Sequence, residues 1–214
     1  MAARNKVLIF FSVMSGGILL ISNIAAVKIW DFFGVPVDGG IILFPLSYIL
    51  ADLTVEFFGS KKANCIILSS SILNIVAILV FFIVGRLPGY DGWNLQESYD
   101  AILGFASRIV CGSLTAYLIS SIVNNIVFEK IRKATIIEER NKKFWYRAIG
   151  SSAVAHIIDS LIFELVAFYG VLPVKDFIMQ AVFAYAAGMI FEIVLSPITV
   201  IVANKIRKKI SLFH

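Results

Sequence analysis

The chain has 214 residues, of which 59% are hydrophobic and 15% are charged, and its mean hydropathy is +0.90. A soluble domain is usually about half apolar and one quarter charged, so this composition excludes an ordinary soluble protein and indicates an integral membrane protein. The net charge of +5 does not point to nucleic acid, because the basic residues flank hydrophobic segments, where anionic lipid and topology explain them. We therefore expect the lipid bilayer as a partner and no nucleic acid.

Six apolar segments follow one another and leave no stretch for a soluble domain. They are Val7–Val27, Gly40–Phe57, Ala63–Gly85, Ala101–Phe128, Ala148–Gly170 and Phe177–Asn204. Since a spanning helix needs about 20 residues, the sequence predicts an all-α polytopic membrane protein, a single domain over residues 1–214 with a bundle of six transmembrane helices. The second segment reads Asp52-x3-Glu56 and the fifth reads Asp159-x4-Glu164, a weak internal similarity that fits two three-helix halves of inverted orientation.

Lysine and arginine are distributed unevenly between the loops. Of the 19 such residues, two precede the first segment, two follow the second, seven follow the fourth and four follow the sixth. Only Lys28, Arg86 and Lys175 fall in the intervening loops. Because cytoplasmic loops are enriched in Lys and Arg, we expect both termini in the cytoplasm, and acids such as Asp31 and Asp38 in the outer loops.

Three predicted helices each carry an acidic residue near the middle of the bilayer. Asp52, Asp159 and Glu192 lie roughly 18, 16 and 22 Å below the outer ends of their segments at 1.5 Å per residue, in a hydrocarbon core about 30 Å thick. A charge at that depth is costly unless it faces a cavity, a partner or a ligand. We expect these acids to converge on a central polar site, with Glu56 and Tyr48 on the same helix face as Asp52.

Two further ionisable residues, Arg108 and Glu164, are expected to have a structural role. Arg108 and Glu164 lie at similar depths, roughly 10 and 9 Å from the outer ends, which predicts a structural ion pair. His156 shares a helix face with Asp159; it is either a ligand contact or proton relay, or a neutral side chain that a neighbouring helix satisfies. Asn23, beside Lys28 at the outer mouth, is expected to be functional.

The sequence offers little support for metal binding or catalysis. A single intramembrane histidine with scattered carboxylates lacks the ligand spacing of a metal site. None of the common local motifs of hydrolases or metalloproteases is present. We expect no metal, no cofactor and no enzymatic activity.

Several blocks of the sequence carry a family resemblance. They are Ser22–Lys28 (SNIAAVK), Phe44–Gly59 (FPLSYILADLTVEFFG), Ser107–Val110 (SRIV), Arg147–Ser152 (RAIGSS) and Asp159–Phe163 (DSLIF). On these blocks the chain resembles the queuosine precursor transporter family, also described as vitamin uptake transporters. The resemblance implies a six-helix importer of 7-deazaguanines (preQ0, preQ1 or queuine) in the cell inner membrane. It leaves open an alternative, a substrate-binding membrane subunit of a multi-component vitamin-type importer.

The acidic site suits such a ligand. A deazaguanine presents a ring N–H and an exocyclic amine on one edge, and a carboxylate accepts from both at once. We expect Asp52, Glu56 or Asp159 to bind that edge, and aromatic residues such as Tyr185 to stack on the ring. The predicted substrate-binding residues are Asn23, Lys28, Phe44, Tyr48, Asp52, Glu56, His156, Asp159 and Glu192. The glycine-containing helices are also compatible with a homodimer.

Overall fold

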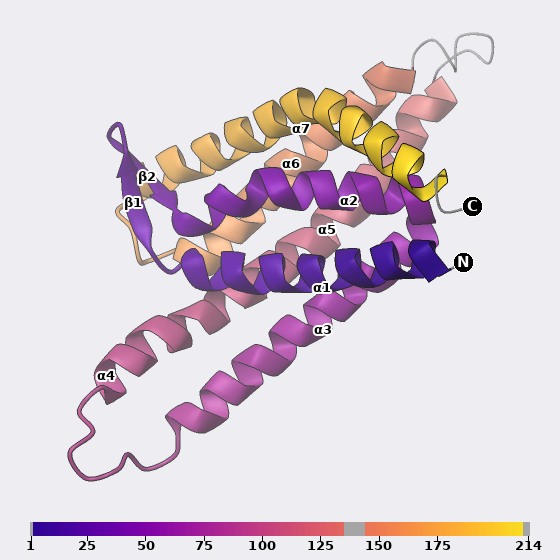
Figure 1. Cartoon of the computed structure of the whole chain (residues 1–214). Helices are drawn as coiled ribbons and strands as arrows, with labels where there is room; N and C mark the ends of the chain where they lie inside the picture. Colours follow the sequence, from indigo (N-terminus) through magenta and orange to yellow (C-terminus); the bar gives the residue numbers. More distant parts are fainter. Residues whose placement is uncertain (1, 135–143, 212–214) are drawn as a thin grey trace.

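A computed structural model describes residues 2–134 and 144–211, and there the chain is almost entirely helical (Figure 1). The long helices are α1 (Ala2–Ala25), α2 (Phe44–Phe58), α3 (Ser60–Gly85), α5 (Phe105–Ala134), α6 (Phe144–Phe168) and α7 (Val174–Ser211). The shorter elements are the strands β1 (Ile29–Phe32) and β2 (Val35–Asp38), the 3-10 helix η1 (Gly39–Leu43), the short helix α4 (Gln96–Tyr99) and the π-helical turn η2 (Asp100–Gly104).

Four stretches of the described helices are long and apolar enough to cross a membrane. They are Asn5–Ala25, Lys61–Gly85, Gln96–Ser120 and Val174–Leu195. Helix α2, with 15 residues, is shorter than the roughly 20 residues that a span needs. The chain is thus a mostly helical, multi-pass membrane protein, as predicted; four stretches of the described residues meet the length and composition of a span, and the predicted total of six stays a prediction.

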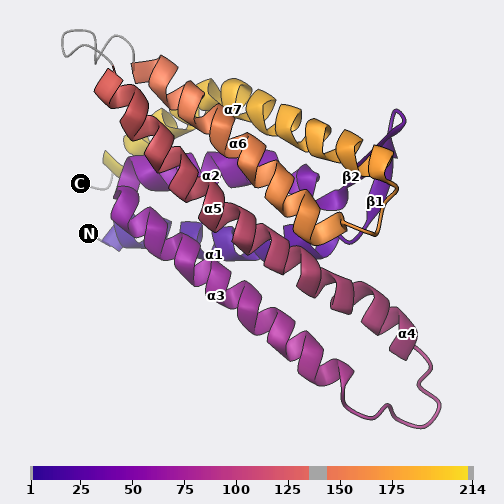
Figure 2. The same ribbon diagram turned by 180° about the vertical axis from the view of Figure 1, so that it is seen from behind.

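The two ends of the bundle differ in character. In both views the first turn of α1 and the last turns of α7 lie at one end, and the β-hairpin lies at the other (Figures 1 and 2). Helices α5 and α6 run along each other, α1 packs on α3, and α2 and α6 both pack on α7. The helix ends that border the four basic segments therefore gather at one end, in agreement with the uneven distribution of Lys and Arg.

A two-stranded antiparallel sheet is the one departure from an all-α fold among the described residues. Ile29 pairs with Asp38 and Phe32 pairs with Val35. The turn between the strands holds Phe33 at φ 53° and Gly34 at φ 86°, and two consecutive residues with positive φ fit the twist of a tight hairpin. We expected only an outer loop here, because Gly34 is the only typical turn residue between the strands.

The segment after the hairpin packs closely against the end of α1. The backbone N–H of Gly39 donates to the carbonyl oxygen of Lys28 at 2.8 Å. A Cβ atom on Gly39 would lie 2.5 Å from the carbonyl oxygen of Ala25, and one on Gly40 would lie 2.8 Å from that of Ser22. The Gly39-Gly40 pair therefore allows the backbone contact that positions β2 and the start of α2.

We predict that Gly39→Ala destabilises the protein, since the backbone oxygen of Ala25 cannot move aside as a flexible side chain would. The expected cost is on the order of 1–3 kcal/mol, as in other overpacked sites, measured as a lower thermal unfolding midpoint in detergent. Gly17→Ala is the matched control, because a Cβ atom there meets nothing within 4 Å and alanine favours the helix by about 0.5–1 kcal/mol. Equal midpoints for the two variants would contradict the close contact.

Candidate functional site

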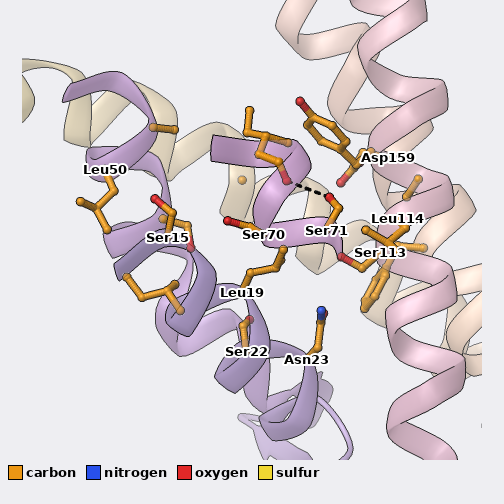
Figure 3. A pocket seen from close by; sticks show the side chains of 18 of the residues that line it. Ser15, Leu19, Ser22, Asn23, Leu50, Ser70, Ser71, Ser113, Leu114 and Asp159 are labelled. Carbon is orange, nitrogen blue, oxygen red and sulfur yellow. Dashed lines mark hydrogen bonds between the residues drawn. The ribbon is translucent and has the colours of Figure 1, made fainter. Parts of the chain in front are cut away.

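A cavity of about 410 Å³ lies among the helices (Figure 3). Its lining comes from all six long helices and from the last residue of β2. Its surface is mostly apolar, although 13 of its 27 described lining residues carry a polar side chain, most of them a hydroxyl. This volume is within the roughly 300–1,000 Å³ range of small-molecule sites. The polar lining includes Asn23, Asp38, Tyr117, His156, Asp159 and Ser160.

Asp159 on α6 supplies a carboxylate to this cavity. Its Oδ1 accepts a hydrogen bond from Ser120 Oγ of α5 at 3.0 Å. Figure 3 shows Asp159 beside Ser113 and Leu114, on the side of the cavity away from Leu50. A carboxylate has about four acceptor positions, and Ser120 occupies one of them. The predicted role of Asp159 in a polar site therefore agrees with its position.

His156 and Glu192 join α6 to α7. Their side chains meet at 3.0 Å between Nε2 and Oε2, and both are partly exposed. His156 lines the cavity, whereas Glu192 is not among its lining residues and contacts His156. The Nε2 atom of His156 has a partner on the neighbouring helix α7, as one of the two explanations holds. Because His156 also lines the cavity, a contact with a ligand stays a prediction.

Asn23 lines the cavity and also holds two helices together. It is buried, and its Nδ2 donates to Oδ1 of Asn74 on α3 at 2.8 Å. Asn74 in turn donates to the carbonyl oxygen of Ser70. Asn23 therefore lies at the cavity and also contributes to the packing of α1 against α3.

Asp38 was expected in an exposed outer loop but is buried, with 3% of its surface exposed. It ends β2, lines the cavity, and accepts the Gly40 N–H on Oδ1 at 2.9 Å. Burial raises the pKa of the Asp38 carboxyl from 3.8 to about 6, against the opposing effect of the backbone N–H groups of Gly40 and Ile41. The Asp-Gly-Gly sequence was the available signal for a side chain folded back onto its own backbone.

The predicted ion pair between Arg108 and Glu164 is not formed in the structure. Arg108 Nε donates to the carbonyl oxygen of Val166 at 2.7 Å and Nη2 donates to that of Tyr169. The guanidinium therefore satisfies backbone groups at the end of α6, where a cation is favourable. Glu164 is fully buried and neither of its carboxylate oxygens has a hydrogen-bond partner among the described residues.

The remaining predicted residues lie outside the described site. Lys28 is exposed and does not line the cavity. The side chains of Phe44, Tyr48, Asp52 and Glu56 are outside the described part of the structure, although their neighbours on α2 at positions 47, 50, 51, 54 and 55 line the cavity.

The cavity lining contains two aromatic residues that were not predicted from the sequence; the predicted stacking residues were Phe44, Tyr48 and Tyr185. Tyr117 on α5 and Phe163 on α6 both line the cavity. Phe163 follows Asp159 by four residues, so helical spacing puts the two on one face. That spacing was the signal available in the sequence.

A bundle of apolar helices around a ligand-sized cavity with intramembrane ionisable groups is the architecture of a membrane transport protein. The chain belongs to the family described as "Putative vitamin uptake transporter", whose model matches residues 38–202. The family resemblance drawn from the sequence is thereby confirmed. No solved structure matches the chain.

Three curated relatives are similar to this chain. The "Probable queuosine precursor transporter" of Bacillus subtilis is 28% identical over 153 residues, which cover 71% of this chain and 65% of that protein. The "Queuosine precursor transporter" of Escherichia coli is 25% identical over 166 residues, 78% of this chain and 71% of the relative. A Haemophilus influenzae protein with the same name as that of Bacillus is 27% identical over 61% of this chain and 51% of its own length.

The chain therefore spans less than two thirds of the length of the Bacillus and Haemophilus relatives. All three relatives bear the names of transporters. With the family match, these names support a transport role for this chain.

We predict that Asp38→Asn stabilises the protein at pH 7.5 but not at pH 4. The pKa of Asp38 is higher in the folded state, so the folded state holds the proton more tightly, and stability falls as pH rises from about 4 to above 6. About two pKa units correspond to at most roughly 3 kcal/mol. Asparagine still accepts the Gly40 N–H but does not ionise. The variant therefore does not lose this stability as pH rises.

Thermal unfolding midpoints in detergent across this pH range measure the effect. Asp91→Asn is the control, because Asp91 is exposed in the loop after α3 and its substitution should leave the profile parallel to wild type. A parallel profile for Asp38→Asn as well would show that burial of Asp38 does not control the pH dependence.

Proposed function

We propose that this chain imports queuosine precursors of the 7-deazaguanine class (preQ0, preQ1 or queuine) through the cavity, with Asp159 binding the base. The observation that carries the proposal is a carboxylate in a mostly apolar, ligand-sized cavity with two aromatic side chains, Tyr117 and Phe163, in the same lining. The names of the three relatives support the substrate class.

The chemistry of the base edge matches Asp159. A deazaguanine offers a ring N–H and an exocyclic amine side by side, and a carboxylate accepts both in a charge-assisted pair. In a poorly hydrated cavity a missing partner costs about 1–3 kcal/mol, so a base without this donor pair is bound less well. Tyr117 and Phe163 are candidates to stack on the ring.

The other predicted residues have supporting roles in this proposal. Asn23 and His156 contact the ligand from α1 and α6, and Glu192 orients His156 through their 3.0 Å contact. Lys28 lies at the entrance. Four residues on α2 complete the proposed acidic and aromatic site; they are Phe44, Tyr48, Asp52 and Glu56.

We further propose six spans, with η1 lengthening α2 and with α6 as the remaining span beyond the four apolar ones. In this arrangement α2 and α6 are corresponding helices of two inverted halves and move during alternating access. The distribution of Lys and Arg supports cytoplasmic termini, and in this proposal the protein lies in the cell inner membrane as a homodimer.

We predict that Asp159→Asn lowers uptake of preQ1 about 10- to 100-fold, because a hydrogen bond to a charged group contributes about 1.5–3 kcal/mol and each 1.4 kcal/mol is tenfold. Asparagine still accepts from Ser120, so the fold should persist. The measurement is queuosine in tRNA of cells that cannot make the precursor, at matched amounts of the transporter in the membrane. Asp91→Asn in the exposed outer loop is the control, and wild-type uptake by both variants would contradict the assignment.

Purified protein in liposomes separates this proposal from a binding subunit that needs an ATP-driven partner. Saturable uptake of preQ1 by this polypeptide alone is the expected result. Binding of preQ1 without uptake would favour the binding subunit.

A further inference from the structure

A second buried polar cluster lies between the β-hairpin and the outer ends of α6 and α7. Glu164 of α6 has 0% of its surface exposed, Gln180 of α7 has 1%, and Asp38 at the end of β2 has 3%. Strand β2 packs on α7, and α7 packs on α6 (Figure 1). The Gln180 amide and the Asp38 carboxylate are the side chains that act on the Glu164 carboxylate.

The cluster is incompletely satisfied. Gln180 faces Glu164, yet neither its Nε2 nor its Oε1 makes a hydrogen bond, and both oxygens of Glu164 also lack a partner among the described residues. A buried polar group without a partner costs about 1–3 kcal/mol, and more when it is charged. A bound species that satisfies Glu164 and Gln180 would remove this cost.

No basic group of the described residues neutralises Glu164. Arg108 on α5 points to the carbonyl oxygens of Val166 and Tyr169. His156 lies eight residues earlier on α6, roughly 12 Å along the helix axis, and contacts Glu192 of α7.

None of the other described charged residues of the surrounding elements, including the half-buried Asp176, is a cause of the electrostatic effect on Glu164. Asp159 is five residues before Glu164 on α6 and bonds to Ser120. Asp176 and Lys175 lie in the first turn of α7, where Lys175 is exposed. Lys28 is exposed, and Asp31 in the hairpin is exposed and accepts from the Gly34 N–H. Asp38 thus remains as the ionisable neighbour of Glu164.

A proton fits this cluster better than a metal ion does. No group of three or more His, Cys, Asp or Glu side chains in the described part of the chain could hold a metal. A proton needs only a single oxygen to bind. A buried carboxylate without a basic partner tends to take up a proton and become neutral. A protonated Glu164 would also gain a donor that Gln180 Oε1 or Asp38 can accept.

We propose that Glu164 is the binding site of a proton that drives import, and that Asp38 passes this proton between the cavity and Glu164. This inference rests on the proposed import function. Asp38 suits the role because it lines the cavity and because its charge acts on the Glu164 carboxylate. Its backbone bond to the Gly40 N–H also holds the carboxylate in place when it is ionised.

The proton balance is simple. A proton from the outer solution binds an oxygen of Asp38. Because Asp38 and Glu164 share no hydrogen bond, the Asp38 side chain must move, or a water must bridge the two groups, before this O–H bond breaks and a new one forms on Glu164. Glu164 later releases the proton toward the cytoplasmic side. The pKa of Asp38, near 6, allows it to gain and lose a proton close to neutral pH. One proton would enter with each precursor molecule.

The test uses the full chain in proteoliposomes with radiolabelled preQ1. When the lumen is one pH unit more alkaline than the outside, coupling to one proton allows preQ1 to accumulate up to about tenfold. A sodium gradient should not support this accumulation. We expect Glu164→Gln to lose this accumulation and to retain exchange of external for internal preQ1 at equal pH. Glu164→Asp should recover part of the accumulation, and Glu97→Gln, an exposed outer acid, should behave as wild type.

A second measurement needs no variant. Dicyclohexylcarbodiimide, which reacts with protonated carboxyl groups in apolar surroundings, should label Glu164 of the wild-type protein, less so as pH rises and regardless of sodium. Peptide mass spectrometry locates the label. This readout tests the proton site even if Glu164→Gln fails to fold.

The outcomes separate the two proposals. Absence of preQ1 exchange by wild type refutes the import function, whereas exchange without accumulation on a pH gradient refutes only the coupling. Accumulation on a sodium gradient, full accumulation by Glu164→Gln, or absence of label on Glu164 would each overturn the proton site. Labelling of Glu164 together with uncoupled exchange in Glu164→Gln would support it.

Discussion

Polar groups inside an apolar bundle must find partners on neighbouring helices, and this constraint organises the chain. Lipid offers no hydrogen bonds, so most intramembrane polar residues bond to their own helix, join two helices or face a cavity, and Glu164 with Gln180 is the exception among the described residues. Asn23 with Asn74 joins α1 to α3, Ser120 with Asp159 joins α5 to α6, and His156 with Glu192 joins α6 to α7. The same contacts leave part of these side chains in the cavity lining, so packing and the site depend on one set of residues.

The hairpin brings a further polar group to the same place from outside the helices. Gly39 and Gly40 allow its end to contact the backbone of α1 closely, and the Gly40 N–H fixes Asp38. A short antiparallel sheet has little stability of its own. Its packing on α7 therefore explains why it persists and why a residue from an extramembrane segment becomes buried.

The sequence predicted what composition and helical spacing determine, and it could not predict contacts between helices. Apolar runs located the long helices, and the cost of charge in lipid led us to expect Asp52, Asp159 and Glu192 at a central polar site. Asp159 lines the cavity, Glu192 does not, and the Asp52 side chain lies outside the described part of the structure. Equal depth suggested that Arg108 pairs with Glu164, but depth says nothing of rotation about the axis, and Arg108 instead bonds to carbonyl groups of α6. The hairpin was missed because its turn carries Phe33, a residue uncommon at positive φ.

Helix α6 directs Asp159 and Glu164 to different angles about its axis, and the lining residue Ser160 lies between them, about 100° from Asp159. At about 100° per residue, Phe163 and His156 fall within about 60° of Asp159, on the side that lines the cavity. Glu164 is five residues beyond Asp159 and so about 140° around the helix, on the side toward Gln180 and Asp38. A rotation or tilt of α6 would therefore change both environments together. One rigid helix can in this way link occupancy of the cavity to the protonation of a carboxyl that the ligand never touches.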